Sequence, residues 1–216
     1  PMTGIVYKST GSWYTVKGSD GSFIECRIKG KFRMKGIKST NPIAVGDHVD
    51  YELDETSDKI TGTIDKIHER TNYIVRKSVN LSHQMHIIAA NIDRVFLLVT
   101  INNPPTTFNF IDRFLVTAEA YGIETILVFN KIDAFKYVHL EEDDFETEKE
   151  AKHYSLEDWK KTWMNKVGNN ALFISALNKE NLEEFKKRVY DEVREIHVTR
   201  FPYNKFLYPD YDETFE

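Results

Sequence analysis

An apolar run that ends in four loop-type residues constrains the second half of this chain most strongly. Residues 125–129 are Thr-Ile-Leu-Val-Phe, and Asn-Lys-Ile-Asp follows at 130–133. A continuous run of β-branched and aromatic residues is typical of a parallel strand that is buried on both faces. In open α/β sheets, ligands bind beyond the carboxyl ends of such strands. The pattern therefore predicts a parallel α/β sheet with a binding loop at residues 130–133.

The residue types in this loop suit a guanine base. The carboxylate of Asp133 can accept both the N1–H and the N2–H of guanine, and Asn130 can donate to its N7 acceptor. The stem of Lys131 can lie over the base and leave its ammonium free. Adenine lacks the N2 amine and carries an amino group where guanine has O6, so the pattern selects guanine. A solvated turn is the alternative.

A second feature favours the guanine site over a simple turn. Another apolar run, residues 171–174, is followed by Ser175, Ala176 and Leu177. Because the carboxyl ends of parallel strands meet at one edge of a sheet, the backbone of these three residues is expected to complete the base site.

The flanking residues predict the rest of an α/β domain over 93–200. Residues 95–99 form a further strand-like run, and a helical pattern between the two runs predicts a strand–helix–strand unit with parallel strands. Ser155 is a candidate cap for a second helix that buries Trp159 and Trp163, and Asn178 for a third. The residues expected to face inward are, in the first helix, Phe110, Ile111, Phe114, Leu115 and Ala118, and in the last, Leu182, Phe185, Val189, Val193 and Ile196.

The first part of the chain has a different pattern. Short alternating stretches over residues 1–70 are separated by turn signals, and five such strands fit a small closed barrel of the OB type. Residues 1–80 carry 13 basic and 10 acidic residues, a balance of +3, whereas the remainder carries 16 and 24, a balance of −8. We therefore expect an OB-fold barrel at 1–70, a linker at 71–92, a partial three-layer α/β domain with parallel strands at 93–200, and an aromatic tail at 201–216.

One stretch of the first part is basic and contains no acid. In an extended conformation its alternating charges share one face, with Phe32 and Met34 on the other. Basic side chains beside aromatic ones on an OB barrel predict an RNA-binding surface, and a solvated hairpin is the alternative. The candidate RNA-binding residues are Arg27, Lys29, Lys31, Arg33, Lys35 and Lys38.

Composition and spacing argue against several other classes of site. Cys26 is the one cysteine, so an internal disulfide is impossible and a reducing, cytoplasmic setting is expected. No apolar run approaches the roughly 20 residues that span a bilayer, so no membrane partner is expected. His83 and His86 lack accompanying ligands for a metal. Residues 36–40 resemble the end of a phosphate loop but lack its adjacent Gly-Lys. We therefore assign no catalytic residue. We also assign no metal-binding residue.

Several motifs together resemble the RsgA family, also called YjeQ or EngC, over residues 3 to 133. They are Tyr-Ile-Val-Arg-Lys-Ser at 73–78, Ile-Ile-Ala-Ala-Asn-Ile-Asp at 87–93, Asn-Asn-Pro-Pro at 102–105, Ile-Asp-Arg-Phe at 111–114 and Asn-Lys-Ile-Asp at 130–133. The resemblance implies an OB domain and a circularly permuted GTPase domain, whose base-recognition motifs precede the phosphate loop. It also implies the small ribosomal subunit and its rRNA as partners.

Beyond Asp133 the sequence resembles the carboxyl end of an HflX-type GTPase instead. The segments concerned are residues 159–164, 173–176 and 195–204. The two resemblances meet at the shared Asn-Lys-x-Asp, which suggests a hybrid joined there or a truncated relative.

The departures from the RsgA pattern bear on activity. The sequence contains no Gly-x-x-x-x-Gly-Lys-Ser/Thr, which supplies the phosphate cradle, and one cysteine cannot supply the zinc ligands of that family. We therefore expect weak binding of GTP or GDP through the base only, no zinc, no Mg²⁺ site and no hydrolysis by this chain alone. A non-catalytic RNA-binding or structural module is the alternative. An exposed sheet edge would also allow self-association.

Overall fold

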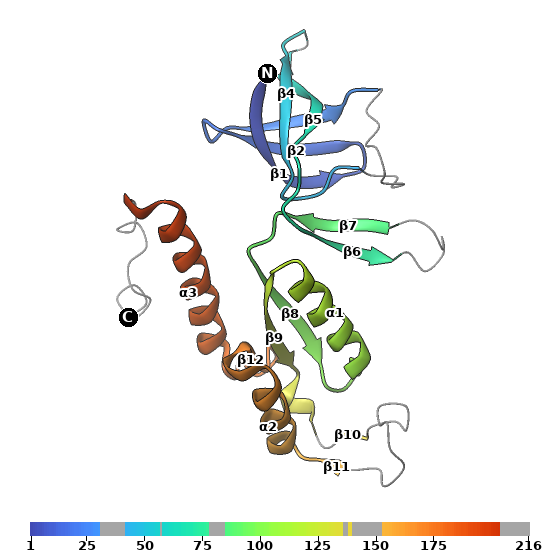
Figure 1. Ribbon diagram of the computed structural model, residues 1–216, viewed down its shortest axis with the longest axis vertical. Helices are drawn as coiled ribbons and strands as arrows, with labels where there is room; N and C mark the ends of the chain where they lie inside the picture. The colour runs from blue at the N-terminus through green and yellow to red at the C-terminus, as the bar shows by residue number, and fades with distance from the viewer. Residues whose placement is uncertain (31–41, 57, 78–84, 136–137, 140–152, 204–216) are drawn as a thin grey trace. The chain divides into compact units, whose positions relative to one another are not determined.

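The computed structural model describes residues 1–30, 42–56, 58–77, 85–135, 138–139 and 153–203 (Figure 1). The chain divides into two compact units, residues 1–92 and 93–216, and each is described here by itself. Four of the candidate RNA-binding residues, Lys31, Arg33, Lys35 and Lys38, lie outside the described residues, as do His83 and the tail from residue 204.

The first unit contains a closed five-stranded barrel with the strand order β1-β2-β3-β5-β4 (Figure 1). Strands β3 and β5 are parallel and the other neighbours are antiparallel. This architecture confirms the barrel expected from the alternating pattern. The strands are β1 (Met2–Thr10), β2 (Trp13–Gly18), β3 (Phe23–Ile28), β4 (His48–Asp54) and β5 (Thr61–Ile67).

Alternation along each strand fills the barrel. In β2, Tyr14 and Val16 point inward and are buried, whereas Trp13, Thr15 and Lys17 are only partly buried. Alternate residues of each strand therefore face the interior and the outer surface of the barrel, which explains the period of two that identified the strands in the sequence. The buried core contains Val6, Tyr14, Val16, Cys26, Ile43, Val49, Tyr51 and Ile64.

The stretch expected as a linker contains an antiparallel hairpin, β6 (Tyr73–Lys77) and β7 (Met85–Ala90). The hairpin is joined to the loop before β4 by the amide of Ala90, which donates to Val45 at 2.9 Å, and the amide of Gly46 in that loop donates to Val6 of β1 at 2.8 Å. Gly46 has φ +91°, and a Cβ there would lie 2.0 Å from the carbonyl oxygen of Ala90. Only glycine permits this approach. The boundaries of the domain and linker stay a prediction.

A buried ion pair fixes the same loop. Arg70 donates to both carboxylate oxygens of Asp47 at 2.6 Å, and Asp47 is fully buried. The amide of Ala44 donates to the same carboxylate at 2.8 Å. The bidentate geometry and the additional donor offset the cost of removing the two charges from water.

The second unit is built on a parallel sheet with the order β12-β9-β8. The strands are β8 (Arg94–Thr100), β9 (Glu124–Asn130) and β12 (Ala171–Phe173), and the helices are α1 (Phe108–Ala120), α2 (Leu156–Val167) and α3 (Leu182–Arg200). Two short strands, β10 (Val138–His139) and β11 (His153–Tyr154), pair separately. Among the described residues, no helix is long and apolar enough to cross a membrane.

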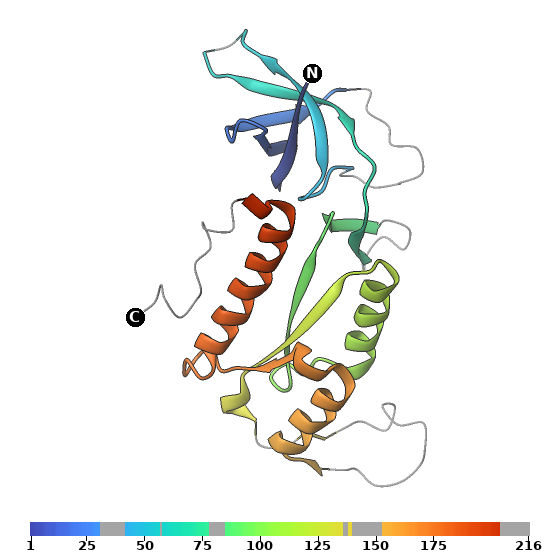
Figure 2. The ribbon, with the colours of Figure 1, turned by 60° about the vertical axis from the view of Figure 1, so that its left-hand side comes forward.

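The two faces of the sheet carry different helices, which confirms the three-layer architecture. Leu127 and Phe129 point to the side where Trp159 and Trp163 of α2 and Ile111 of α1 complete the core. Their neighbours on β9, Ile126 and Val128, point to the other side, where Leu182 and Phe185 of α3 pack. Figure 2 shows α1 and α3 on opposite sides of the sheet.

The helix ends agree with the sequence in two cases and differ in the third. Gly122, with φ +66°, follows α1, and Ser155 begins α2 with a complete capping box. The third helix begins at Leu182 after Asn181, which has a left-handed backbone and no side-chain cap, so the assignment of Asn178 as its cap was wrong. The amide of Asn178 instead donates to the hydroxyl of Ser175 at 3.0 Å.

Two of the residues expected to face inward are exposed. Phe110 in α1 is 52% exposed and Val193 in α3 is 48% exposed. Helical spacing identifies a stripe of residues but not how much of that stripe the neighbouring elements cover.

Candidate functional site

The loop at 130–133 lies at the carboxyl end of β9, where the sequence placed it. Asn130 ends the strand, Lys131 has a left-handed backbone with φ 64°, and a short 3-10 helix, Ile132–Ala134, follows. The amide of Ile132 donates to the carbonyl of Ile174 at 3.3 Å, which ties this loop to the end of β12. The two predicted halves of the site are therefore adjacent.

Asn130 joins the two halves through its side-chain carbonyl. Its Oδ1 accepts from the amide of Lys131 at 2.8 Å and from the amide of Ala176 at 3.0 Å. An asparagine amide has separate donor and acceptor ends, so both of these bonds use the oxygen and leave the Nδ2 hydrogens for other partners. Among the described residues, the structure records no partner for this nitrogen.

Ser175 holds the carboxylate of Asp133. The Ser175 hydroxyl, which is fully buried, donates to Oδ1 of Asp133 at 2.5 Å and accepts from the amide of Asn178 at 3.0 Å. Asp133 itself is exposed. A carboxylate has about four lone-pair sites, so one bond from serine orients Asp133 and leaves acceptor capacity directed to the outside.

The backbone N–H groups of residues 175–177 mostly have hydrogen-bond partners within the protein. The amide of Ser175 donates to Glu180 at 3.1 Å, and that of Ala176 donates to Asn130. Leu177, 82% exposed, stands at the tip of the loop. The structure thus brings all six candidate base-site residues together at one edge of the sheet, but it assigns internal partners to two of the three expected backbone donors.

Lys131 differs from the expectation of a free ammonium. Its Nζ donates to the carbonyl of Asn103, in the loop that follows β8. That loop is closed by a bond from the amide of Thr106 to the carbonyl of Thr100 at 2.9 Å. Loops from all three strands of the sheet therefore meet at the site.

In the barrel, the two candidate RNA-binding residues that the structure describes are both exposed. Arg27 lies near the end of β3 and Lys29 just beyond it, with the partly buried Ile28 between them. The alternation expected of an extended basic strip is therefore present over this part. The guanidinium of Arg27 lies over the ring of Trp13, 3.9 Å from its centroid.

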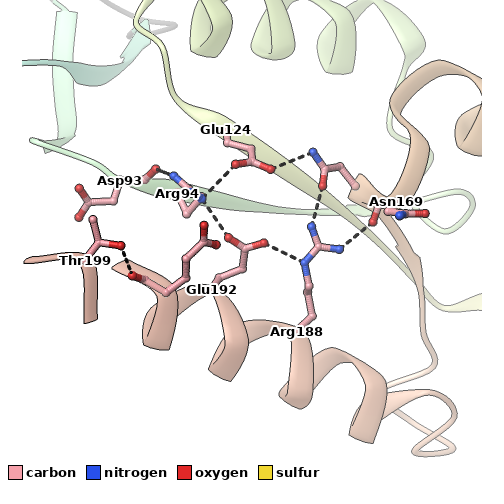
Figure 3. Close-up of polar contacts among 9 residues, drawn as sticks. Asp93, Arg94, Glu124, Asn169, Arg188, Glu192 and Thr199 are labelled. Atoms are coloured by element: carbon pink, nitrogen blue, oxygen red, sulfur yellow. Dashed lines mark hydrogen bonds and ion pairs between the residues drawn. The ribbon is translucent and has the colours of Figure 1, made fainter. Parts of the chain in front are cut away.

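A charged network that sequence reasoning missed lies at the opposite end of the sheet (Figure 3). The carboxylate of Glu192 on α3 accepts from Arg94 and from Arg188, each at 2.9 Å. Arg94 also pairs with Glu124 at 3.1 Å, and Arg188 donates to Asn170 at 2.6 Å. Because Asn170 in turn donates to Glu124 at 3.3 Å, the contacts form a closed ring that joins α3, β8, β9 and the residues before β12.

The network shifts the pKa values of its members and favours their charged forms. Burial alone would raise the pKa of the Glu192 carboxyl, but the hydrogen bonds and charges of Arg188 and Arg94 outweigh it and lower that pKa. The pKa of Arg94 is raised by its acidic partners despite partial burial. A glutamate between Val189 and Ile196, on the inward stripe of a helix, was the sequence signal that could have located this network.

Zinc and magnesium in proteins are bound by cysteine, histidine and acidic side chains. Cys26, the one cysteine, is buried in the barrel core, and the described residues contain no group of three or more histidine, cysteine or acidic side chains arranged for a metal.

Two family models match this chain. The model for the RsgA N-terminal domain matches residues 3–64, and that for the RsgA GTPase matches residues 67–196. The second match continues well past Asp133 and so includes most of the part that resembles HflX. This continuity corrects the expectation of a hybrid whose family changes at Asp133.

Curated relatives cover most of the chain. "Small ribosomal subunit biogenesis GTPase RsgA" of Flavobacterium psychrophilum is 65% identical over 192 residues, which are 89% of this chain and 55% of the relative. The protein of the same name from Flavobacterium johnsoniae is 62% identical, with the same coverage of both chains. The chain thus spans about half the length of the curated relatives it matches.

Solved structures agree with the fold. The crystal structure of YjeQ from Thermotoga maritima is 30% identical with a TM-score of 0.56, covering 87% of this chain and 56% of that one. YloQ, titled a circularly permuted GTPase, supports the fold alone at 24% identity, with a TM-score of 0.52 and coverage of 90% and 56%. With a closed barrel, a parallel sheet that carries Asn-Lys-x-Asp at the end of its central strand, and family matches over both units, this chain belongs to the RsgA family.

Proposed function

We propose that this chain acts in the cytoplasm on the small ribosomal subunit, binds rRNA through its barrel and recognises guanine through Asp133. One observation carries the guanine part of the proposal. The buried hydroxyl of Ser175 holds an exposed Asp133 carboxylate in place at 2.5 Å, at the edge of the sheet where ligands bind. A carboxylate fixed in this way is already oriented to accept the two adjacent N–H donors of guanine.

Affinity at this site should be low. Guanine nucleotides carry most of their charge on the phosphates, and the sequence contains no Gly-x-x-x-x-Gly-Lys-Ser/Thr to hold them. We expect a dissociation constant no better than about 1 mM, equivalent to roughly −4 kcal/mol. The base alone would provide selectivity, and the phosphates would add little.

Titration with GDP and ADP, followed by chemical shifts or calorimetry, tests the proposal. The wild type should respond to GDP more strongly than to ADP, and Asp133→Ala should remove the difference. Asp112→Ala is the matched control, because Asp112 is an exposed carboxylate of the same unit that pairs with Lys166 on the surface. Equal responses of the wild type to both nucleotides would eliminate guanine recognition.

We propose further that this chain alone does not hydrolyse GTP. Phosphoryl transfer depends on positioning and electrostatic stabilisation of the phosphates, normally by a glycine-rich loop and a metal ion. Phosphate release should stay at background for the purified protein, with and without small ribosomal subunits. Turnover that Asp133→Ala abolishes would contradict this proposal and would mean that a partner completes the site.

The rRNA part of the proposal rests on the basic strip and on the RsgA relatives, whose name assigns them to biogenesis of the small ribosomal subunit. Reversing the charges at Lys29, Lys31 and Arg33 to glutamate should weaken binding to the subunit, and binding of the wild type should decrease steeply with salt. Lys186→Glu, an exposed basic residue on α3, is the control for a non-specific charge effect. Unchanged affinity in the triple variant would refute the role of the strip.

A non-catalytic RNA-binding or structural module is the second candidate. The bonds that Asn130 accepts from the amides of Lys131 and Ala176 support it, because they join the loop after β9 to the loop after β12 without a ligand. The same nucleotide titration separates the two functions. If Asn130→Ala lowers stability while GDP and ADP bind equally to the wild type, the motif is architectural.

A further inference from the structure

The outer surface of β1, β2 and β3 carries aromatic rings paired with cations. One pair is Trp13 with Arg27, whose guanidinium lies over the indole ring at 3.9 Å from its centroid. Trp13 is partly buried and Arg27 is exposed. The indole therefore lies against the guanidinium of a side chain that is itself exposed.

A second group lies further along the same strands. Tyr7 and Phe23 contact edge to face, with centroids 5.5 Å apart, and are 51% and 57% exposed. The ammonium of Lys17 lies over both rings, 5.5 Å and 5.6 Å from their centroids. Lys17 is four residues from Trp13 on β2, so about 13 Å of strand separates the two groups. We call these five residues, Tyr7, Trp13, Lys17, Phe23 and Arg27, the aromatic face of the barrel.

An open groove of about 620 Å³ adjoins Trp13 and is also lined by Lys8 and Lys59. Glu25 is the acidic residue in its lining, and its carboxylate accepts from the hydroxyl of Thr15 at 2.6 Å. Basic side chains therefore outnumber acidic ones around the aromatic rings, in a chain whose net charge is −5. This charge distribution fits an anionic partner.

We propose that the aromatic face binds unpaired RNA bases by stacking. The inference rests on the proposed binding of rRNA and specifies which surface and which state of the RNA are involved. A base would stack on the guanidinium of Arg27, which lies over Trp13, and another on the rings of Tyr7 and Phe23. Lys8, Lys17 and Lys59 would contact phosphates along the groove.

Physical chemistry favours unpaired RNA over a duplex as the occupant. Bases in a duplex are stacked on each other, and the deep, narrow major groove of A-form RNA cannot be entered by side chains. An unpaired base offers a free π-face, which aromatic side chains and guanidinium planes bind with little regard to sequence. A duplex keeps the faces of its bases stacked inside the helix, so the exposed rings of the barrel would find no free base to stack on.

Trp13 also provides the assay. The other two tryptophans, Trp159 and Trp163, are 3% and 0% exposed in the core of the second unit. Quenching of tryptophan emission by a short unpaired oligoribonucleotide would thus report stacking near Trp13. Binding itself should be measured independently, by anisotropy of a labelled strand, with the whole chain.

Changing the aromatic residues of the protein and removing the bases of the RNA, in one set of measurements, separates stacking from attraction to the phosphates. Trp13→Ala and Phe23→Ala should each weaken binding of the unpaired strand by roughly 5- to 150-fold. A strand of the same length with abasic residues keeps the phosphates and lacks the bases, so it should bind the wild type and Trp13→Ala equally. Trp13→Phe should restore most of the affinity, and Phe110→Ala, which removes an exposed ring on α1, should have no effect.

The outcomes distinguish this inference from the proposed function. If the aromatic variants bind unpaired RNA like the wild type while charge reversal at Lys29, Lys31 and Arg33 abolishes binding, stacking is refuted and rRNA binding stands. Equal binding of a duplex and the unpaired strand, without quenching, refutes stacking too. If the wild type binds neither RNA nor the small subunit, both proposals fail. Circular dichroism of each variant shows whether the barrel is intact.

Discussion

Replacing Glu192 by glutamine tests the charged network beneath α3 (Figure 3). The carboxylate accepts from two guanidinium groups at 2.9 Å and its side chain is 10% exposed. Removing one partner from a fully buried pair costs about 3–5 kcal/mol. Arg94 and Arg188 are 26% and 22% exposed, so water partly screens them, and we expect a loss of about 2–3 kcal/mol in the free energy of unfolding of the second unit.

The pH dependence provides an independent check. The pKa of Glu192 is lowered in the folded protein, chiefly by hydrogen bonds from Arg188 and Arg94 acting against burial. Its contribution to stability is therefore complete above the unfolded pKa of about 4.3 and is lost as the pH falls through the folded pKa. The difference between wild type and Glu192→Gln should be full at neutral pH and should shrink as the solution becomes more acidic than the unfolded pKa.

Urea unfolding in a Trp13→Phe background measures this difference, because Trp159 and Trp163 then report the second unit alone. Glu183→Gln is the control on the same helix, since Glu183 is 73% exposed and pairs with Lys186, and its loss should cost less than about 0.5 kcal/mol. If Glu192→Gln and Glu183→Gln destabilise equally, or if the effect of Glu192→Gln does not depend on pH, the reasoning about the network is refuted.

Three further predictions concern other parts of the chain. Gly46→Ala should destabilise the first unit by about 3 kcal/mol or more, because its Cβ would lie 2.0 Å from the carbonyl oxygen of Ala90, whereas Gly21→Ala, with φ +83° and open space, should cost only about 1 kcal/mol in urea unfolding. Burial and, to a lesser extent, the charge of Glu25 raise the pKa of Cys26 to about 12, so its thiol should react with a thiol reagent only after unfolding, and rapid labelling of the native protein would contradict this. Self-association through the outer strand β8 should appear in sedimentation velocity as a dimer that Leu98→Lys weakens, because Leu98 is 60% exposed, and a monomer at every concentration would contradict it.

The strands and the position of the loop at 130–133 could be predicted because their signals are local. A continuous apolar run before Asn130 identifies a strand buried on both faces, and β9 is buried along its length except at its ends. Alternation in residues 13–18 identifies a barrel strand in the same way. Ser155 begins a helix because its cap requires only a partner three residues away.

The predictions that failed depend on residues distant in the sequence. Asn178 is a good capping residue by type, but its amide is bonded to Ser175, and the helix starts at Leu182 instead. Val193 fits the apolar stripe of α3 yet is half exposed, while Glu192 beside it is buried. Local pattern shows which residues could face inward, and the width and charge of the surface beneath decide which do.

The sequence by itself determined the two kinds of unit, the parallel sheet, and the place of Asn130 and Asp133 at the end of an apolar strand, since these follow from periodicity along the chain. Only the tertiary structure decided that Ser175 orients Asp133, that the carbonyl of Asn103 accepts from the ammonium of Lys131, and that Arg94 donates to Glu192. These pairs are separated by 42, 28 and 98 residues, and a contact across such a distance exists only once the sheet has brought its strand ends together.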